Sequence, residues 1–354
     1  MNPIKLFNFF FSHFYSVLHM EPPAQTFLLN HKDNILELDL LHGAKILSLV
    51  LKDPSNKPHT IIQGSSDPSR PFLSNGGFLM YPWVNRLDPL EITSSPPVKI
   101  NPDWLDGNGV ALHGLFAACE REIVESGSNF VILKPTNMEK LREKNNFLKQ
   151  IPKFIESFIL LEGSLSVMTE FLYEEDGESL GFGYGYHPYI QLDDLGINDA
   201  RIQTNMSHFI QVDEKLLPIK GPNAQYQVKE LKELLNDGEI TKDLNLDHCF
   251  VRKNEENESF FSIIFKEQGL EVCLNDSIEM LLKKEMQFQE VIKGKEKIPL
   301  QYFQVYTPPD RKRIAVEPQS SGANAYFIGK EELRSLKNKD SGKYGIFNII
   351  LKGT

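Results

Sequence analysis

The sequence predicts an all-β protein, folded as one large antiparallel β-sandwich with few short helices. Segments of about four to eight residues, rich in β-branched and aromatic side chains, recur along the 354 residues with turn-forming residues between them. Only one segment has persuasive helical spacing. Strands and helices do not alternate as βαβ units require, and no internal repeat is visible, so a parallel-sheet architecture is disfavoured.

The N-terminal part of the chain is predicted to consist of short strands joined by turns. Residues 53–70 are rich in proline and serine, which predicts a surface loop. The charged run over residues 137–154 is interpreted as a solvated face or a loop insertion. Strands are predicted over residues 25–29, 35–41, 46–52, 121–125 and 130–134.

The remaining chain continues in the same way. Glu162-Gly163 is predicted to turn a hairpin between residues 158–161 and 164–173. Residues 228–236 have apolar side chains at helical spacing followed by Asp-Gly, which predicts a short helix. Further strands are predicted over residues 201–204, 209–212, 260–265, 270–274, 279–283, 301–307, 314–319 and 348–352.

Composition excludes several classes of function. Acidic residues outnumber basic residues 48 to 38, which gives a net charge of −10 and argues against a nucleic-acid partner. The cysteines are far apart and form no C-x-x-C pair, so neither a zinc cluster nor a disulfide framework is expected. Reduced thiols indicate a cytoplasmic protein. The cysteines are Cys119, Cys249 and Cys273.

Residues 1–20 form an aromatic-rich N-terminal extension. Asn8, His13 and His19 interrupt its apolar run, and no small-residue cleavage site follows, so a signal peptide is disfavoured. The segment is also too short and too polar to span a bilayer. We expect it to be disordered or loosely docked, with residues 21–354 forming a single domain that has no membrane partner.

The segment from Gly181 to Leu192 alternates glycines with aromatic residues and then places a histidine before a proline. Such alternation is typical of a strand with Phe182, Tyr184 and Tyr186 on one face. Proline disfavours the α region for the residue before it, so His187 is expected to be extended at a strand end. From this segment alone, a histidine packed in an aromatic core and a site histidine both remain open.

Polar residues with catalytic potential stand beside glycine, proline or aromatic residues at five places in the chain. A histidine and a carboxylate can act as an acid–base pair near neutral pH, and an arginine recognises oxygen ligands. The chain contains no glycine-rich phosphate loop, no G-x-S-x-G motif and no H-E-x-x-H motif. Spacing alone does not show that the five residues converge. They are Arg86, His113, His187, Asp247 and Glu317.

The order of these pieces resembles the aldose 1-epimerase (galactose mutarotase) family. No single motif is specific for this family, but the whole set of motifs in this order is specific for it. Departures from the family pattern at Leu87, at Leu115-Phe116-Ala117-Ala118 and at Ile190-Gln191 affect the expected sugar preference more than the chemistry. The pieces are Asn85-Arg86-Leu87, Leu112-His113-Gly114, Tyr186-His187-Pro188-Tyr189, Asp247-His248-Cys249-Phe250, Gln304-Val305-Tyr306-Thr307-Pro308 and Val316-Glu317-Pro318-Gln319.

The resemblance implies a galactose mutarotase-like β-sandwich and an aldose 1-epimerase that interconverts the α and β anomers of a free hexose. Glu317 would be the general base at the anomeric hydroxyl, and His187 the general acid at the ring oxygen. His113 would help to orient the ring oxygen. Arg86, Asp247 and Asn85 would bind sugar hydroxyls.

The resemblance further implies an isomerase with no metal and no organic cofactor, whose partner is a small aldose. We expect a monomer or homodimer. Tyr184, Tyr186 and Tyr189 are candidate walls of the sugar groove.

Two alternatives remain. The first is a mutarotase that acts on a sugar phosphate, for which Arg311, Lys312 and Arg313 could supply cationic groups. The second is a sugar-binding or regulatory protein that has lost turnover, although such a protein would be expected to lose Glu317 or His187.

Overall fold

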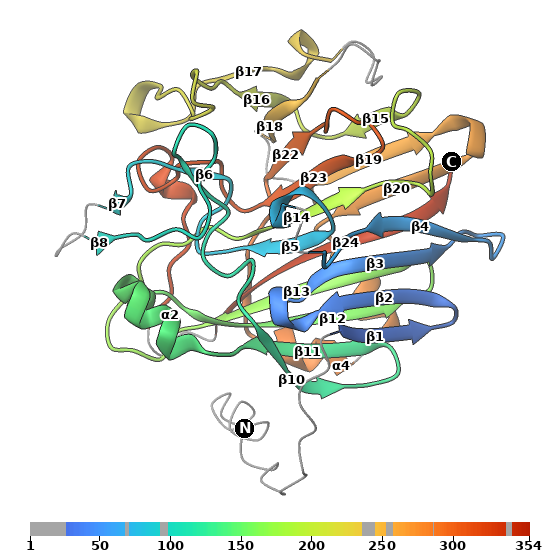
Figure 1. Ribbon diagram of the computed structural model, residues 1–354, viewed down its shortest axis with the longest axis horizontal. Helices are drawn as coiled ribbons and strands as arrows, with labels where there is room; N and C mark the ends of the chain where they lie inside the picture. Colours follow the sequence, from blue (N-terminus) through green and yellow to red (C-terminus); the bar gives the residue numbers. More distant parts are fainter. Residues whose placement is uncertain are drawn as a thin grey trace, which may run out of the picture.

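The computed structural model describes residues 26–67, 71–92, 98–235, 245–252, 258–285, 287–337 and 342–354. Two large antiparallel sheets pack face to face in this part of the chain (Figure 1). This architecture confirms the predicted all-β sandwich with few short helices. The extension predicted over residues 1–20 lies outside the described residues.

The first sheet has eleven strands in the described part of the chain, and β14, β23, β22 and β18 are neighbours near its middle. Strand β4 (Pro58–Gln63) pairs with β3 off the main path. The main path runs β1 (Thr26–His31), β2 (Asn34–Asp39), β3 (Lys45–Lys52), β5 (Gly77–Met80), β14 (Gly185–Ile190), β23 (Ile314–Gln319), β22 (Tyr302–Tyr306), β18 (Asp247–Val251), β16 (His208–Ile210) and β17 (Val228–Glu230).

The second sheet has nine strands in the described residues, with β21 (Glu296–Lys297) parallel to β24. Two small ribbons, β6 (Arg86–Leu87) with β9 (Ala111–Leu112) and β7 (Glu91–Ile92) with β8 (Val98–Lys99), lie to one side of the sandwich (Figure 1). The main path runs β10 (Arg121–Ser126), β11 (Phe130–Pro135), β12 (Lys153–Leu161), β13 (Ser164–Leu172), β24 (Lys343–Gly353), β20 (Leu270–Asn275), β19 (Phe260–Phe265) and β15 (Arg201–Thr204).

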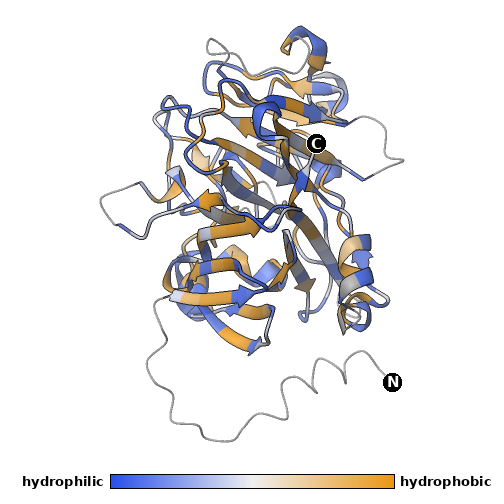
Figure 2. Ribbon diagram, turned by 90° about the vertical axis from the view of Figure 1, so that its right-hand side faces the viewer, coloured by the Kyte–Doolittle hydropathy of each residue, from blue (hydrophilic) through white to orange (hydrophobic). Residues whose placement is uncertain are grey.

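The core lies between the two sheets and follows the alternation of the strands, which Figure 2 shows as alternating hydrophobic and hydrophilic colours. Tyr186 of β14 meets Phe347 of β24 with ring centroids 4.8 Å apart, so aromatic rings link the sheets. One ion pair is enclosed in this core. Arg121 Nε lies 2.6 Å from Glu156 Oε2, and both side chains are 0% exposed.

Three local predictions are wrong. The predicted loop over residues 53–70 contains β4, which extends β3 at the sheet. The helix predicted over residues 228–236 is not formed in its described part, 228–235: β17 pairs with β16, and the 3-10 turn η5 (Leu231–Glu233) follows. Residues 279–283 form helix α3 (Glu279–Lys284) instead of a strand. Sheet pairing overrides a short helical pattern, and five residues of apolar character do not distinguish helix from strand.

The charged run over residues 137–154 forms helix α2 (Met138–Lys144) and the 3-10 turn η3 (Asn146–Gln150) before β12 begins. The helix has no buried residue, as expected for a solvated face. However, Phe147 and Leu148 are buried in the main core, so the segment also closes one end of the sandwich. Among the described helices, α4 (Gln287–Ile292) included, none has the length and apolarity needed to cross a membrane.

Candidate active site

Four neighbouring strands bring their outward side chains into register on the outer face of the first sheet. The pairing of β14 with β23 places His187 opposite Glu317. The next pairings place Gln304 of β22 opposite Glu317 and Cys249 of β18 opposite Gln304. These four residues therefore form one row across the sheet.

A second row lies two residues further along each strand. It contains Tyr189 opposite Ala315, then Tyr306, and then Asp247. Because side chains on a strand alternate between faces, Tyr186 points to the opposite face from His187 and is buried in the core. Tyr184 is buried in the same core, so the prediction that Tyr184 and Tyr186 wall the sugar groove is wrong.

His187 and Glu317 form the centre of the first row. His187 Nε2 lies 3.1 Å from Glu317 Oε1, and the two side chains are only 5% and 2% exposed. The second carboxylate oxygen, Oε2, accepts a hydrogen bond of 3.0 Å from Gln319 Nε2. The ring of Phe78 stacks on the His187 imidazole with centroids 4.7 Å apart. The imidazole is thus fixed against the carboxylate.

His113 reaches the same place from the segment that follows β9. Its backbone N–H donates to the carbonyl of Asn85 over 2.9 Å, and its φ of 58° turns the chain there. The His113 ring stands edge-on to His187 with centroids 5.0 Å apart. The turn requires Gly114, because at φ 78° a Cβ at this position would lie 2.0 Å from the carbonyl oxygen of Tyr81.

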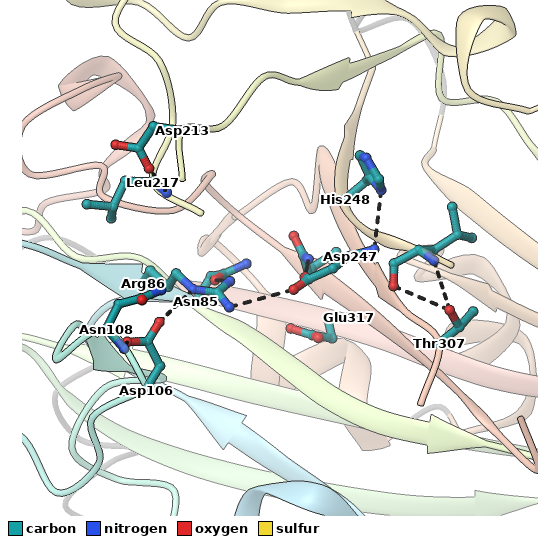
Figure 3. Close-up of polar contacts among 12 residues, drawn as sticks. Asn85, Arg86, Asp106, Asn108, Asp213, Leu217, Asp247, His248, Thr307 and Glu317 are labelled. Atoms are coloured by element: carbon teal, nitrogen blue, oxygen red, sulfur yellow. Dashed lines mark hydrogen bonds and ion pairs between the residues drawn. The ribbon is translucent and has the colours of Figure 1, made fainter. Parts of the chain in front are cut away.

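Arg86 and Asp247 form a polar cluster beside Glu317 (Figure 3). Arg86 Nε donates to Asp106 Oδ2 over 3.1 Å, and Arg86 Nη2 lies 3.6 Å from Asp247 Oδ2. Asn85 Oδ1 accepts a bond of 3.3 Å from Arg86 Nη1. Gln304 Nε2 donates to Asp247 Oδ1 over 2.6 Å, which ties the cluster to the first row.

A small, partly open pocket lies over this cluster. Gln304 lines the pocket and also stands opposite Glu317, so the pocket adjoins the acid–base pair. Among the described residues, no group of three His, Cys, Asp or Glu side chains is arranged to hold a metal ion. The pocket is lined by Asn85, Arg86, Ile210, Val212, Leu216, Pro218, Asp247, Cys249, Gln304 and Ala323.

Burial shifts the pKa values of the acid–base residues in opposite directions. Desolvation, with a smaller contribution from Asp247, raises the pKa of Glu317 well above its ordinary value. Desolvation, together with the charge of Lys45, lowers the pKa of His187 to about 3. The pKa of His113 is also lowered well below its ordinary value, by burial and then by His187 and Arg86. All three groups therefore favour their uncharged forms.

A family model described as aldose 1-epimerase matches residues 26–321, which contain all of these side chains. The chain belongs to the aldose 1-epimerase family. Its fold is similar to that of an aldose epimerase homologue from C. elegans, with 14% identity over 93% of this chain and 99% of that chain and a TM-score of 0.66. It is likewise similar to a galactose mutarotase-like protein from Clostridium acetobutylicum, with 16% identity over 91% and 93% and a TM-score of 0.67. No curated protein matched the sequence.

The six site residues predicted from the sequence of this aldose 1-epimerase family member lie close together: Asn85, Arg86 and Asp247 line the pocket, and His113, His187 and Glu317 lie beside it. The sequence interpretation missed Gln304 and Asp106. Alternation along β22, the strand that precedes Pro308, could have identified Gln304, since Gln304 shares a face with Tyr306. Nothing in the spacing points to Asp106, because its contact with Arg86 depends on the pairing of β6 with β9.

Proposed function

We propose that this member of the aldose 1-epimerase family interconverts the α and β anomers of a free hexose such as glucose or galactose. The observation that carries the proposal is the buried pair of His187 Nε2 and Glu317 Oε1, 3.1 Å apart, beside a pocket that polar side chains line in part. A positioned acid and a positioned base are what opening and closing a hemiacetal ring needs.

In the proposed reaction, the one proton of the pair resides on His187 when ring opening begins, so that ionised Glu317 takes the proton of the anomeric hydroxyl while His187 Nε2 gives its proton to the ring oxygen. The electron pair of the O–H bond forms the aldehyde C=O, and the bond between C1 and the ring oxygen breaks. Rotation about C1–C2 exposes the other face of the aldehyde. Ring closure then reverses both proton transfers, so the two residues exchange roles. The reaction consists of these proton transfers and the breaking and re-forming of one C–O bond, and it needs no cofactor.

The surrounding residues orient the sugar in this scheme. His113 is kept uncharged by its lowered pKa, so it can donate to the ring oxygen without adding a positive charge beside His187. Arg86 and Asn85 donate to hydroxyl oxygens, and Asp247 accepts from hydroxyl groups. Such fixed contacts supply the orientation that a ring-opening step requires.

The opposed pKa shifts predict an unusual pH profile. The pair works with one proton shared between its two groups, and the relevant pKa values belong to the pair. On the acid side, kcat/KM should fall near the lowered pKa of His187, about 3, where a second proton binds to the pair. It should fall on the alkaline side only above the raised pKa of Glu317, where the last proton leaves.

Polarimetry at a series of pH values, corrected for buffer-catalysed mutarotation, measures this profile. Asp247→Asn supplies the comparison, because the charge of Asp247 raises the pKa of Glu317 and its removal should move the alkaline limb to lower pH. An alkaline limb that does not move, or that moves to higher pH, contradicts the assignment.

The function itself is tested by following freshly dissolved α-D-glucose and α-D-galactose in a polarimeter with and without the protein. Acceleration that increases in proportion to protein concentration supports the proposal. Sugar binding without acceleration would instead favour a non-catalytic sugar-binding protein.

A sugar-phosphate substrate is the second candidate, because a cation lies near His187. The guanidinium carbon of Arg313 sits 5.4 Å from the centroid of the Tyr189 ring, and that ring lies 4.9 Å from the His187 ring. Comparing the rates for glucose and glucose 6-phosphate separates the two candidates. If kcat/KM is higher for glucose 6-phosphate than for glucose, the sugar phosphate takes the place of the free hexose as the proposed substrate.

A further inference from the structure

The pocket beside the acid–base pair has two chemically different walls. The polar lining residues include Arg86 of the β6 ribbon, Asp247 of β18 and Gln304 of β22. The apolar part of the wall consists of Ile210, at the end of β16 in the sheet, and of Val212, Leu216, Pro218 and Ala323, which lie outside the strands.

A tight hairpin over residues 211–219 builds most of the apolar wall. Ile219 N–H donates to the carbonyl of Gln211 over 2.8 Å, and Asp213 N–H donates to the carbonyl of Leu217 over 2.8 Å. The Asp213 carboxylate caps the turn by accepting from the N–H groups of Lys215 and Leu217, at 2.8 and 3.0 Å. Figure 3 shows Asp213 and Leu217 over Asn85 and Arg86. These hydrogen bonds hold the hairpin over residues 211–219 in a fixed conformation, and we call it the roof of the pocket.

The tip of this roof carries a strained leucine. Leu216 has a φ of 60°, in the left-handed region that glycine and asparagine adopt more easily than leucine. Nothing in the turn's hydrogen bonding requires a leucine, because Leu216 contributes only its backbone N–H, to the Asp213 carbonyl over 3.0 Å. Strain of this kind persists where the side chain has a use, and this side chain lines the pocket.

Resting on the proposed function, we propose that Leu216 is a specificity residue that packs on a C–H face of the bound aldopyranose. The hydroxyl edge of the sugar then faces Arg86, Asp247 and Gln304. An aldose with an axial hydroxyl on the roof-facing side leaves that hydroxyl buried without a partner, which weakens its binding. The site therefore takes aldopyranoses whose roof-facing side presents only C–H groups.

Leu216→Gly separates this role from a structural one, because glycine adopts a φ of 60° without strain. KM for the preferred aldose should rise roughly tenfold, the effect of a small loss of apolar contact, with kcat within about twofold of wild type and Tm unchanged. Asn56→Gly, at φ 68° in an exposed turn, is the matched control and should change neither KM nor kcat. A change in KM below about twofold overturns the proposal, and so does a rise in KM that is accompanied by a fall in Tm.

Leu216→Asn tests selectivity, because asparagine tolerates this conformation and offers a hydrogen bond to a roof-facing hydroxyl. We compare D-glucose, D-galactose, D-mannose and D-allose. The ratio of kcat/KM between the best aldose and its poorest single-centre epimer should fall at least about threefold. An unchanged or larger ratio overturns the proposal.

Calorimetric titration keeps this inference separate from the proposed function. D-Glucose and D-galactose are titrated into wild type and Leu216→Gly whether or not mutarotation is accelerated. Binding by wild type that weakens in the variant supports the roof contact even if turnover is not seen. Equal dissociation constants, or no binding by either protein, overturn the roof contact.

Discussion

Glu317→Gln is expected to reduce kcat for mutarotation by ~10²–10⁴-fold, because it removes the base that takes the anomeric proton. The amide keeps the shape of the carboxyl group and can still meet His187 Nε2 and Gln319 Nε2. The fold should therefore be retained. Polarimetry measures the rate, and circular dichroism reports the fold.

The same variant, although it lowers kcat, is expected to raise the stability of the folded protein. The pKa of Glu317 is higher in the folded protein than in the unfolded chain. The folded state therefore loses stability relative to the unfolded chain once the pH exceeds the pKa that this carboxyl has in the unfolded chain. The loss grows as the pH rises toward the folded pKa. An amide cannot ionise, so the free energy of unfolding of Glu317→Gln should exceed that of wild type by an amount that increases with pH over this range.

Glu125→Gln is the control, since Glu125 is exposed on β10 at the edge of the second sheet. It should leave both kcat and the unfolding free energy unchanged. If Glu317→Gln equilibrates anomers as fast as wild type, Glu317 is not the base.

Arg121→Met is expected to lower the free energy of unfolding by about 3–5 kcal/mol, because it leaves the carboxyl group of Glu156 buried without its charged partner. The guanidinium also donates to the carbonyl oxygens of Cys119 and Phe116 in the segment that leads from His113 to β10. Burial already raises the pKa of Glu156, and the nearby Arg121 opposes this shift. Urea denaturation at neutral pH measures the loss.

The double variant Arg121→Met/Glu156→Leu replaces both charges with apolar groups. It should recover part of the lost stability, since no unpaired buried charge remains, although the two carbonyls still lack their donor. A single variant that loses less than about 1 kcal/mol, or a double variant no more stable than the single, contradicts this account of the core.

Most strands could be predicted because their apolar alternation is bounded by residues with strong turn preferences. The hairpin of β12 and β13 is an example: Glu162-Gly163 marks its turn, and Gly163 adopts a φ of 68°. Helix α3 could not be predicted, because its six residues carry too short a pattern to show a helical period. Strand β17 was mistaken for a helix because its pairing with β16 decides its conformation, and pairing is not visible in one sequence.

The candidate site was located by motif order, whereas its geometry was not predictable. His187 and Glu317 are separated by more than a hundred residues, and only the register of β14 with β23 shows that they meet. Likewise, the assignment of Tyr186 to the core depends on which face of β14 turns inward. Alternation defines two faces without saying which one meets the other sheet.

The order of strands has a consequence for how the molecule folds. Strand β24, Lys343–Gly353, inserts between β13 and β20, and β23 inserts between β14 and β22. Both central positions are thus filled by segments late in the chain, and each must pair with a strand made much earlier, β24 with β13 and β23 with β14. Pairings of such long sequence separation form slowly, because the intervening loop must be closed before the contacts stabilise it. Until then the neighbouring strands expose unpaired edges, so this chain should depend on protection from aggregation while it folds.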